Sequence, residues 1–253
     1  MKKTILILIT SFAISLFTKA QENLTFQKPS AEILALADYK RAPTVTMDSK
    51  KEFMLLSYRD TYKSLNDLNQ EEMRLGGLRI NPVTNISSTI TYINNFKIRK
   101  ISSQDEIQVA GLPENPRIAN VLMSPNEKKI AFTHTTNTGV ELWVLDVETA
   151  RAERLTEAIL NANMGNPVSW LSDNVNLLVR LLPKNRIALT NTKKDLPVGP
   201  TVSSSDGSIS QNPTFQDLLK NKADEQNFES LITSDLYKIS ITCKTELFKP
   251  FAM

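Results

Sequence analysis

The chain has 253 residues, of which 41% are hydrophobic and 23% charged, so it is long and apolar enough to fold around a sizeable core. It carries 30 Lys and Arg residues against 27 Asp and Glu residues, and three of the lysines lie in the first 20 residues, which contain no acid. The remainder is therefore formally neutral, and we predict no nucleic-acid partner. The single cysteine, Cys243, excludes an internal disulfide, and we expect it to be a passive residue rather than a reactive thiol.

The segment Met1–Ala20 has the features of a secretory signal peptide. Two lysines follow the initial methionine, Ile5–Phe17 is largely apolar, and Ala20 ends a run of residues that suits a cleavage site. The apolar part is too short for a membrane span, and no cysteine follows it to carry a lipid anchor. We therefore expect cleavage before Gln21, export to the periplasm or the extracellular space, and a mature chain, residues 21–253, without a membrane span.

Short elements are predicted in the first part of the mature chain. Ser30 precedes an apolar-rich run to Ala37, which predicts a short capped helix that is stopped by Pro43. Val45–Met47 and Phe53–Ser57 are expected to form a first strand pair. Further short strands are predicted downstream: Ile90–Ile93, Phe96–Ile101 and Glu106–Val109.

Between these strands, Ser57–Gly77 is polar and charged, and we expect a long insertion rather than a core helix. Arg59, Asp60 and Lys63 within it are candidates for lining a groove. The alternative, which we favour, is that they form the solvated face of a loop.

The clearest pattern lies between Val121 and Thr156, where three β-rich runs are separated by short polar turns. Pro125 and the residues beside it favour a tight turn. The run Leu142–Val147 is apolar on both faces, as expected for a strand covered on two sides. The segment is predicted to be an antiparallel meander, which needs similar neighbours to bury both of its faces.

Such neighbours occur at regular intervals in the sequence. Ile130 and Leu177 follow similar turns and lie 47 residues apart, which is close to the period of propeller blades. Leu145 and Ile239 lie 94 residues apart, twice that interval. A weaker upstream copy of the turn precedes Phe53, at Asp48–Lys51.

After Val179 the strand pattern is interrupted. Pro183–Ser210 is rich in polar residues and proline and is predicted to be a loop. Two helices are expected next, one beginning near Thr214 and Asp217, which have capping-box spacing. The second is indicated by the apolar spacing of Phe228, Leu231 and Ile232, with its acidic residues near its start. The β pattern returns at Leu236 and continues to Leu247 and Phe248.

Residue types that carry out chemistry are scarce. The sequence contains no Gly-x-Ser-x-Gly nucleophile motif, and its only histidine, His134, is expected to be structural rather than catalytic. One His and one Cys about a hundred positions apart give no zinc spacing, and there is no calcium loop or phosphate-binding glycine loop. We therefore predict no catalytic residue, no metal and no cofactor. Trp143 and Trp170 are predicted to pack in the core rather than to stack on a ligand.

Six runs of the sequence share a resemblance to one known family: Leu75–Pro82, Pro116–Asn120, Ser124–Pro125, Gly139–Asp146, Gln216–Asn221 and Asp224–Glu229. They resemble the N-terminal propeller of prolyl-oligopeptidase-family (S9) serine peptidases, in the glutamyl-peptidase-like subgroup. The resemblance implies an all-β, partial β-propeller of about three to four blades with a short helical insertion near residues 213–233. The family carries its nucleophile in a C-terminal α/β-hydrolase domain, which has no counterpart in these residues.

Two functions follow as expectations. The first is the non-catalytic N-terminal propeller portion of an exported serine peptidase, inactive alone, which gates and positions peptide substrates for the hydrolase domain. The alternative is a stand-alone exported propeller-type binding or scaffold protein. The final residues, Phe251–Met253, would leave the edge of a blade open, and this favours the first reading.

Overall fold

The computed structural model describes residues 28–103, 105–190, 207, 217–242 and 244–252. The chain divides into two units, residues 1–39 and 40–253. In the first unit, α2 (Ala31–Ala37) is the short helix that the sequence predicts. Its predicted cap is wrong, because the Ser30 side chain makes no capping hydrogen bond. The signal peptide predicted at residues 1–20 lies outside the described residues.

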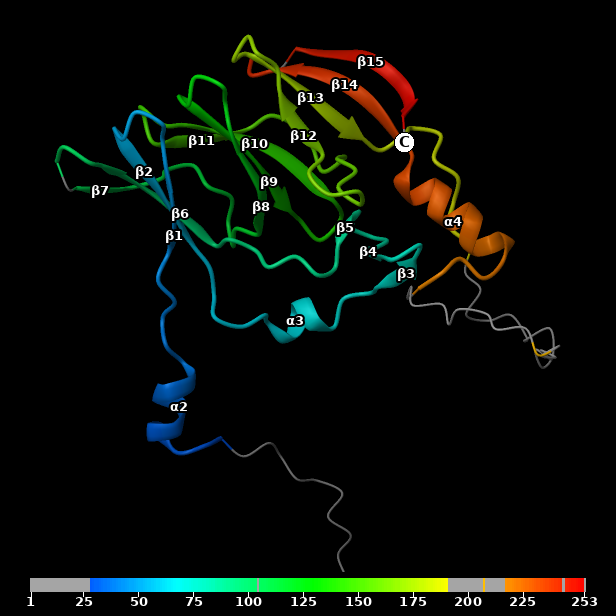
Figure 1. The fold of residues 1–253 in the computed structure, drawn as a ribbon, viewed down its shortest axis with the longest axis horizontal. Helices are drawn as coiled ribbons and strands as arrows, with labels where there is room; N and C mark the ends of the chain where they lie inside the picture. The colour runs from blue at the N-terminus through cyan, green and yellow to red at the C-terminus, as the bar shows by residue number, and fades with distance from the viewer. Residues whose placement is uncertain (1–27, 104, 191–206, 208–216, 243, 253) are drawn as a thin grey trace, which may run out of the picture. The chain divides into compact units, whose positions relative to one another are not determined.

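Three four-stranded antiparallel sheets form most of the second unit (Figure 1). We call them the first blade, the second blade and the third blade. The first blade contains β1 (Thr44–Met47), β2 (Phe53–Tyr58), β6 (Asn95–Lys100) and β7 (Glu106–Gln108). The second contains β8 (Ile118–Met123), β9 (Lys129–Thr135), β10 (Val140–Asp146) and β11 (Arg151–Arg154). The third contains β12 (Val168–Trp170), β13 (Asn176–Leu181), β14 (Ser234–Ser240) and β15 (Thr245–Ala252).

A smaller three-stranded sheet, the insert sheet, completes the β structure of the described residues. It consists of β3 (Met73–Leu75), β4 (Leu78–Asn81) and β5 (Ile86–Ser87). The predicted all-β fold, a partial propeller of three to four blades, is therefore confirmed.

The second and third blades share one register. Ile130 pairs with Leu145 in the second blade, and Leu177 pairs with Ile239 in the third. Both intervals that the sequence predicts, 47 and 94 residues, therefore join equivalent positions.

The turn between the first two strands, which we call the first turn, has the same geometry in each blade. The first turns are Asp48–Phe53, Ser124–Lys129 and Leu171–Asn176, and in each the N–H of the first residue donates to the carbonyl of the last. The fourth residue of each turn has a positive φ of about 60°: Lys51, Glu127 and Asn174. The upstream copy of the turn predicted at Asp48–Lys51 is therefore confirmed.

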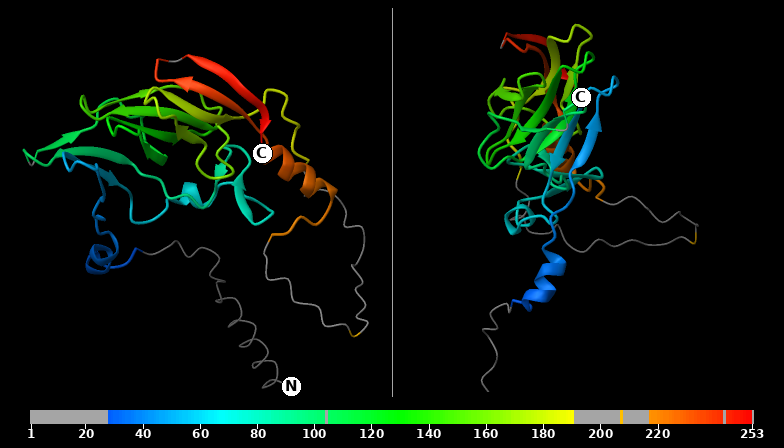
Figure 2. Two further views of the ribbon diagram at one scale, coloured as in Figure 1. Left: turned by 45° about the horizontal axis from the view of Figure 1, so that its top comes forward. Right: turned by 90° about the vertical axis from the view of Figure 1, so that its left-hand side faces the viewer.

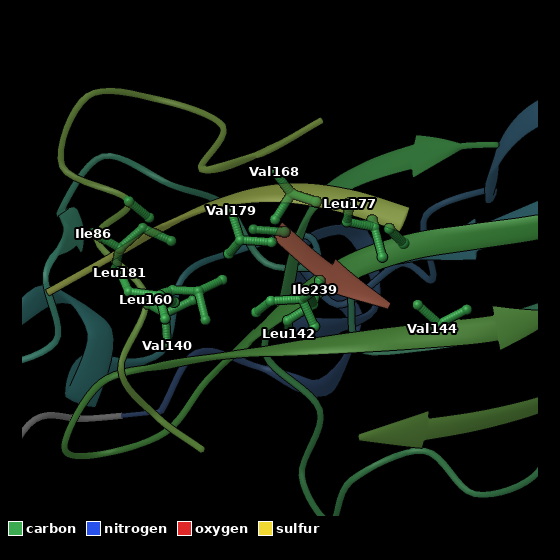
Figure 3. Close-up of a cluster of buried hydrophobic side chains, with 13 residues drawn as sticks. Ile86, Val140, Leu142, Val144, Leu160, Val168, Leu177, Val179, Leu181 and Ile239 are labelled. Atoms are coloured by element: carbon green, nitrogen blue, oxygen red, sulfur yellow. The ribbon is translucent and has the colours of Figure 1, made fainter. Parts of the chain in front are cut away.

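Each blade has a leading face, toward the preceding blade, and a trailing face, toward the following one. Alternate residues of a strand point to opposite faces, so one strand can serve two cores. The trailing face of the first blade packs on the leading face of the second through Phe53, Leu55, Phe96, Ile98, Ile130, Phe132 and Leu145. The trailing face of the second blade packs on the leading face of the third through Ala131, Val140, Leu142, Val144, Leu177, Val179, Leu181 and Ile239 (Figure 3).

Both tryptophans belong to these cores, as the sequence predicts. The Trp143 ring stacks on Phe132 with ring centroids 6.2 Å apart. Trp170 packs against the core between the second and third blades, and its Nε1–H donates to the Leu122 carbonyl at 3.1 Å.

Two insertions interrupt the blades, each between the second and third strands. The first carries α3 (Leu65–Leu68) and the insert sheet, and the second carries α4 (Lys222–Ile232). The insertions meet, because Leu75 and Ile80 of the insert sheet form a buried cluster with Leu231 of α4. Figure 2 shows α4 and the insert sheet side by side in two further views.

Two predicted elements are wrong. Ile90–Ile93 forms no strand; only Ile93 makes an isolated bridge, while Ile90 packs against the core between the second and third blades. The helix predicted from Thr214 is also wrong where it can be followed, because Asp217 has a φ of +60° and the residues up to Asn221 are not helical. Thr214 itself lies outside the described residues. The second predicted helix, α4, is confirmed, with Asn221 as its N-cap accepting from the Asp224 N–H at 2.9 Å.

Candidate functional site

A polar cleft of about 1030 Å³ lies beside the first insertion, between the first and second blades. It is formed by α3 and its flanking residues, the start of β6, the segment before β8 and the β9–β10 turn. The lining residues are Asp60, Ser64, Asn66, Asp67, Asn69, Gln70, Asn94, Asn95, Asn115, Pro116, Arg117 and Asn137. All of them except the proline are polar.

Amide side chains dominate the cleft. Asn94 donates to the Asp60 carboxylate at 2.8 Å, and Asn95 and Gln70 bond to neighbouring amides of the fold. Four others are exposed and make no side-chain hydrogen bond to the part of the chain that the structure describes: Asn66, Asn69, Asn115 and Asn137. Each carries both a donor and an acceptor, so together they can serve the alternating N–H and C=O groups of a ligand.

One wall of the cleft is fixed by an ion pair between the insertion and the second blade. Arg117 Nη2 lies 2.8 Å from Asp67 Oδ1, and the two side chains are 21% and 25% exposed. The Ser64 hydroxyl donates to the other oxygen of Asp67 at 2.7 Å. The Arg117 guanidinium also lies over the Tyr92 ring, 4.5 Å from its centroid. Burial of this ring is the main cause that raises the pKa of Tyr92.

His134 lies behind this wall and is only 7% exposed. Its Nδ1 accepts the Arg117 backbone N–H at 3.2 Å, so the neutral ring is assigned a proton on Nε2. Burial is the main cause that lowers the pKa of His134; the Glu141 charge opposes this effect and the Arg117 charge adds to it. The neutral ring therefore supports the backbone at the start of β8 and does not face the cleft as an acid or base.

Acidification should weaken the fold through His134. Its pKa in the folded chain lies below the ordinary value of 6.5, so the unfolded chain binds the proton more tightly. The stability that the neutral His134 ring contributes is present above pH 6.5. It is lost as the pH falls from there through the pKa of His134 in the folded chain. Because this is the only histidine, a His134→Asn variant, which keeps an acceptor but does not titrate, should show a flatter fall in urea midpoint between pH 7 and pH 5. Identical slopes in the two proteins would contradict this assignment.

Of the three residues that the sequence offered for a groove, the structure brings one to the cleft. Asp60 lines it, whereas Arg59 donates to the Thr44 hydroxyl at 2.7 Å and Lys63 to the Ser88 carbonyl at 3.0 Å. The four exposed asparagines of the cleft were not predicted from the sequence. Their position in the sequence is the signal that could have indicated them, because Asn115 precedes one strand of the second blade and Asn137 follows the next.

Other features of the described residues are less suited to a site. A cavity of about 420 Å³ is lined by first-turn residues of mixed charge, and one of about 530 Å³ lies beside α4.

Within the described ranges, no group of three or more His, Cys, Asp or Glu side chains is placed to hold a metal ion. No helix in this part of the chain has the length and apolar character needed to cross a membrane. Cys243 lies outside the described residues.

Sequence comparison places these features in a family context. No family model matches the chain. It is 31% identical over 225 residues to a probable chloroplastic glutamyl endopeptidase of Oryza sativa subsp. japonica, covering 83% of this chain and 24% of the relative. It is 29% identical over 229 residues to the corresponding protein of Arabidopsis thaliana, covering 85% of this chain and 24% of the relative. The chain thus spans about a quarter of the length of these relatives.

Among solved structures, the acylaminoacyl peptidase of Pyrococcus horikoshii aligns with 85% of this chain and 26% of its own, at 16% identity and a TM-score of 0.39. The relation to the glutamyl endopeptidases rests on sequence. The chain therefore resembles the propeller region of the prolyl-oligopeptidase (S9) family of serine peptidases, in its glutamyl-peptidase-like subgroup.

Proposed function

We propose that this chain is the non-catalytic propeller portion of an exported serine peptidase, and that it gates and positions peptide substrates for an α/β-hydrolase domain outside these residues. The observation that carries the proposal is the 31% identity to a glutamyl endopeptidase over 83% of the chain. The absence of a Gly-x-Ser-x-Gly motif from the sequence supports a role in binding rather than in bond cleavage.

The cleft supports peptides as the ligand class. An extended peptide presents N–H and C=O groups that need partners once they leave water, and amide side chains supply both. The described residues that line the cleft include no aromatic ring on which a sugar would stack. Asp67 is already neutralised by Arg117 and the Asp60 carboxylate accepts a hydrogen bond from Asn94, so most of the lining offers main-chain partners rather than charge.

The purified chain should bind a blocked hexapeptide with a central glutamate and should not cleave it. Removing one amide from the cleft, as in Asn69→Leu or Asn137→Leu, deletes a hydrogen bond worth about 1 kcal/mol and should weaken binding about fivefold. Isothermal titration calorimetry measures the affinity, and chromatography of the incubated peptide measures cleavage.

Asn185→Leu is the matched control, because Asn185 is also exposed but lies beside α4 and outside the cleft. It should leave the affinity unchanged. Equal affinities for all three variants and the unchanged chain would show that the peptide does not bind in the cleft. Cleavage of the peptide by the chain alone would show that the chain is catalytic.

Export is part of this proposal and is supported by the leader-like sequence of Met1–Ala20. Expression with this segment in a Gram-negative host should give a periplasmic or extracellular product whose first residue is Gln21. N-terminal sequencing tests this, and an intact leader on a cytoplasmic product would contradict it.

A further inference from the structure

The short helix α3 exposes both of its leucines. Leu65 is 84% exposed and Leu68 is 66% exposed, and no residue of the helix is buried. Polar contacts hold the helix in place instead: the Ser64 hydroxyl accepts the Asp67 N–H at 3.1 Å as its N-cap, and the Asp67 carboxylate pairs with Arg117. The fold therefore does not require apolar side chains at the two leucine positions, and their adjacent exposure points to a contact with something outside this chain.

The outer side of α3 combines apolar and amide side chains. Successive residues of a helix are turned by about 100° around its axis. Because Asp67 points toward the second blade, the opposite side carries Leu68, Leu65, Asn69 and Asn66, in that order around the helix. Asn66 and Asn69 line the cleft and are two of its four free amides. The two leucines, which we call the apolar rim, thus lie directly beside the amides.

The spacing of these side chains suits an extended peptide. Helical residues three positions apart have Cβ atoms about 5–6 Å apart, and this spacing applies both to Leu65 and Leu68 and to Asn66 and Asn69. In an extended peptide, alternate side chains lie on one side of the chain and about 6–7 Å apart. A peptide that places its main chain against the asparagines can therefore place two alternate side chains against the apolar rim.

We propose that Leu65 and Leu68 form an apolar subsite, which selects peptides with large apolar side chains at two alternate positions. The inference rests on the proposed function, because it needs a peptide main chain in the cleft. Contact with the rim removes apolar surface of both partners from water, which favours binding. A wholly apolar partner surface fits less well, because it would cover the neighbouring amides and leave them without hydrogen bonds.

Two blocked hexapeptides test the subsite. Both have a central glutamate, whose two neighbours are leucines in one peptide and serines in the other, so that these neighbours share one side of the extended chain. Isothermal titration calorimetry should show that the unchanged chain binds the leucine peptide about tenfold more tightly. A Leu65→Gln, Leu68→Gln double variant keeps good helix formers. It should bind the two peptides with affinities that agree within about twofold, and it should bind the serine peptide as the unchanged chain does.

Leu247→Gln is the matched control, because Leu247 on β15 is 50% exposed and does not line the cleft. This variant should keep the full preference for the leucine peptide. The urea midpoint of the double variant should equal that of the unchanged chain, since both leucines are exposed.

The outcomes separate this inference from the proposed function. Equal binding of the two peptides by the unchanged chain, with both weakened by Asn137→Leu, would overturn the apolar subsite and leave the function standing. A leucine preference that survives in the double variant would also overturn the subsite. Binding of neither peptide would contradict the function and the subsite together. Self-association in sedimentation velocity that the double variant abolishes would show that the rim binds a second copy instead.

Discussion

Replacing Phe132 with alanine should lower the free energy of unfolding by about 3–5 kcal/mol, the cost of removing a large aromatic side chain from a filled core. Phe132 is fully buried between the first and second blades. Its ring meets Phe96 edge to face, with centroids 5.5 Å apart, and stacks on Trp143 at 6.2 Å. The loss combines the transfer of these apolar atoms with a cavity that two β-sheets cannot close.

Urea unfolding measures this loss, and the same substitution elsewhere provides the control. Phe248 on β15 is 67% exposed, so Phe248→Ala should change the free energy of unfolding by less than about 0.5 kcal/mol. Similar losses for the two variants would show that Phe132 does not lie in the core between the blades.

Replacing Gly111 with alanine should lower the free energy of unfolding by about 2–5 kcal/mol. Gly111 has a φ of +74°, and an added Cβ would lie 2.4 Å from the Ala152 carbonyl oxygen. The left-handed backbone accounts for about 1–2 kcal/mol, and displacing a backbone atom accounts for about 1–3 kcal/mol more. The displaced segment is paired, because the Ala152 N–H donates to the Ala110 carbonyl at 2.8 Å and so joins the first and second blades.

Gly77→Ala separates the two causes of this loss. Gly77 has a φ of +79°, and its added Cβ would meet nothing within 4 Å. Thermal and urea unfolding should therefore give a loss of only about 1–2 kcal/mol for this variant. If the two glycine variants lose the same stability, the close approach of Gly111 to β11 is not a constraint on the fold.

The blades could be predicted because their signal is local and repeated. The run around Ile130 alternates apolar residues over a few positions, and the same register returns at Leu177 with a similar turn before it. Hydrogen bonds within each turn fix its geometry: the Asp48 carboxylate accepts the Phe53 N–H at 2.9 Å, and the Ser124 hydroxyl accepts the Lys129 N–H at 3.0 Å. Such short-range patterns need no knowledge of distant contacts.

The cleft and the insertions could not be predicted in the same way. Arg117 and Asp67 are 50 residues apart, and only the packing of the first insertion against the second blade brings them together. Ile90 is β-branched, as is typical of strand residues, yet it lies outside the strands and packs against the core between the second and third blades. Asp217 fits the capping pattern of a first helix in sequence, but it adopts a left-handed turn, and its carbonyl accepts the Gly77 N–H of the insert sheet at 3.4 Å. In each case a tertiary contact overrides the local preference.

The contact between the two insertions couples parts of the molecule that the blades leave independent. The first and third blades share no blade-to-blade core among the described residues, but Ile80 and Leu231 are fully buried in one cluster. Any hinge motion that moved the first blade away from the third would have to separate this cluster and expose its apolar surface to water. The contact between the insert sheet and α4 thus resists separation of the first and third blades. The loops around the cleft lie outside this contact, so their sequences can change without weakening it.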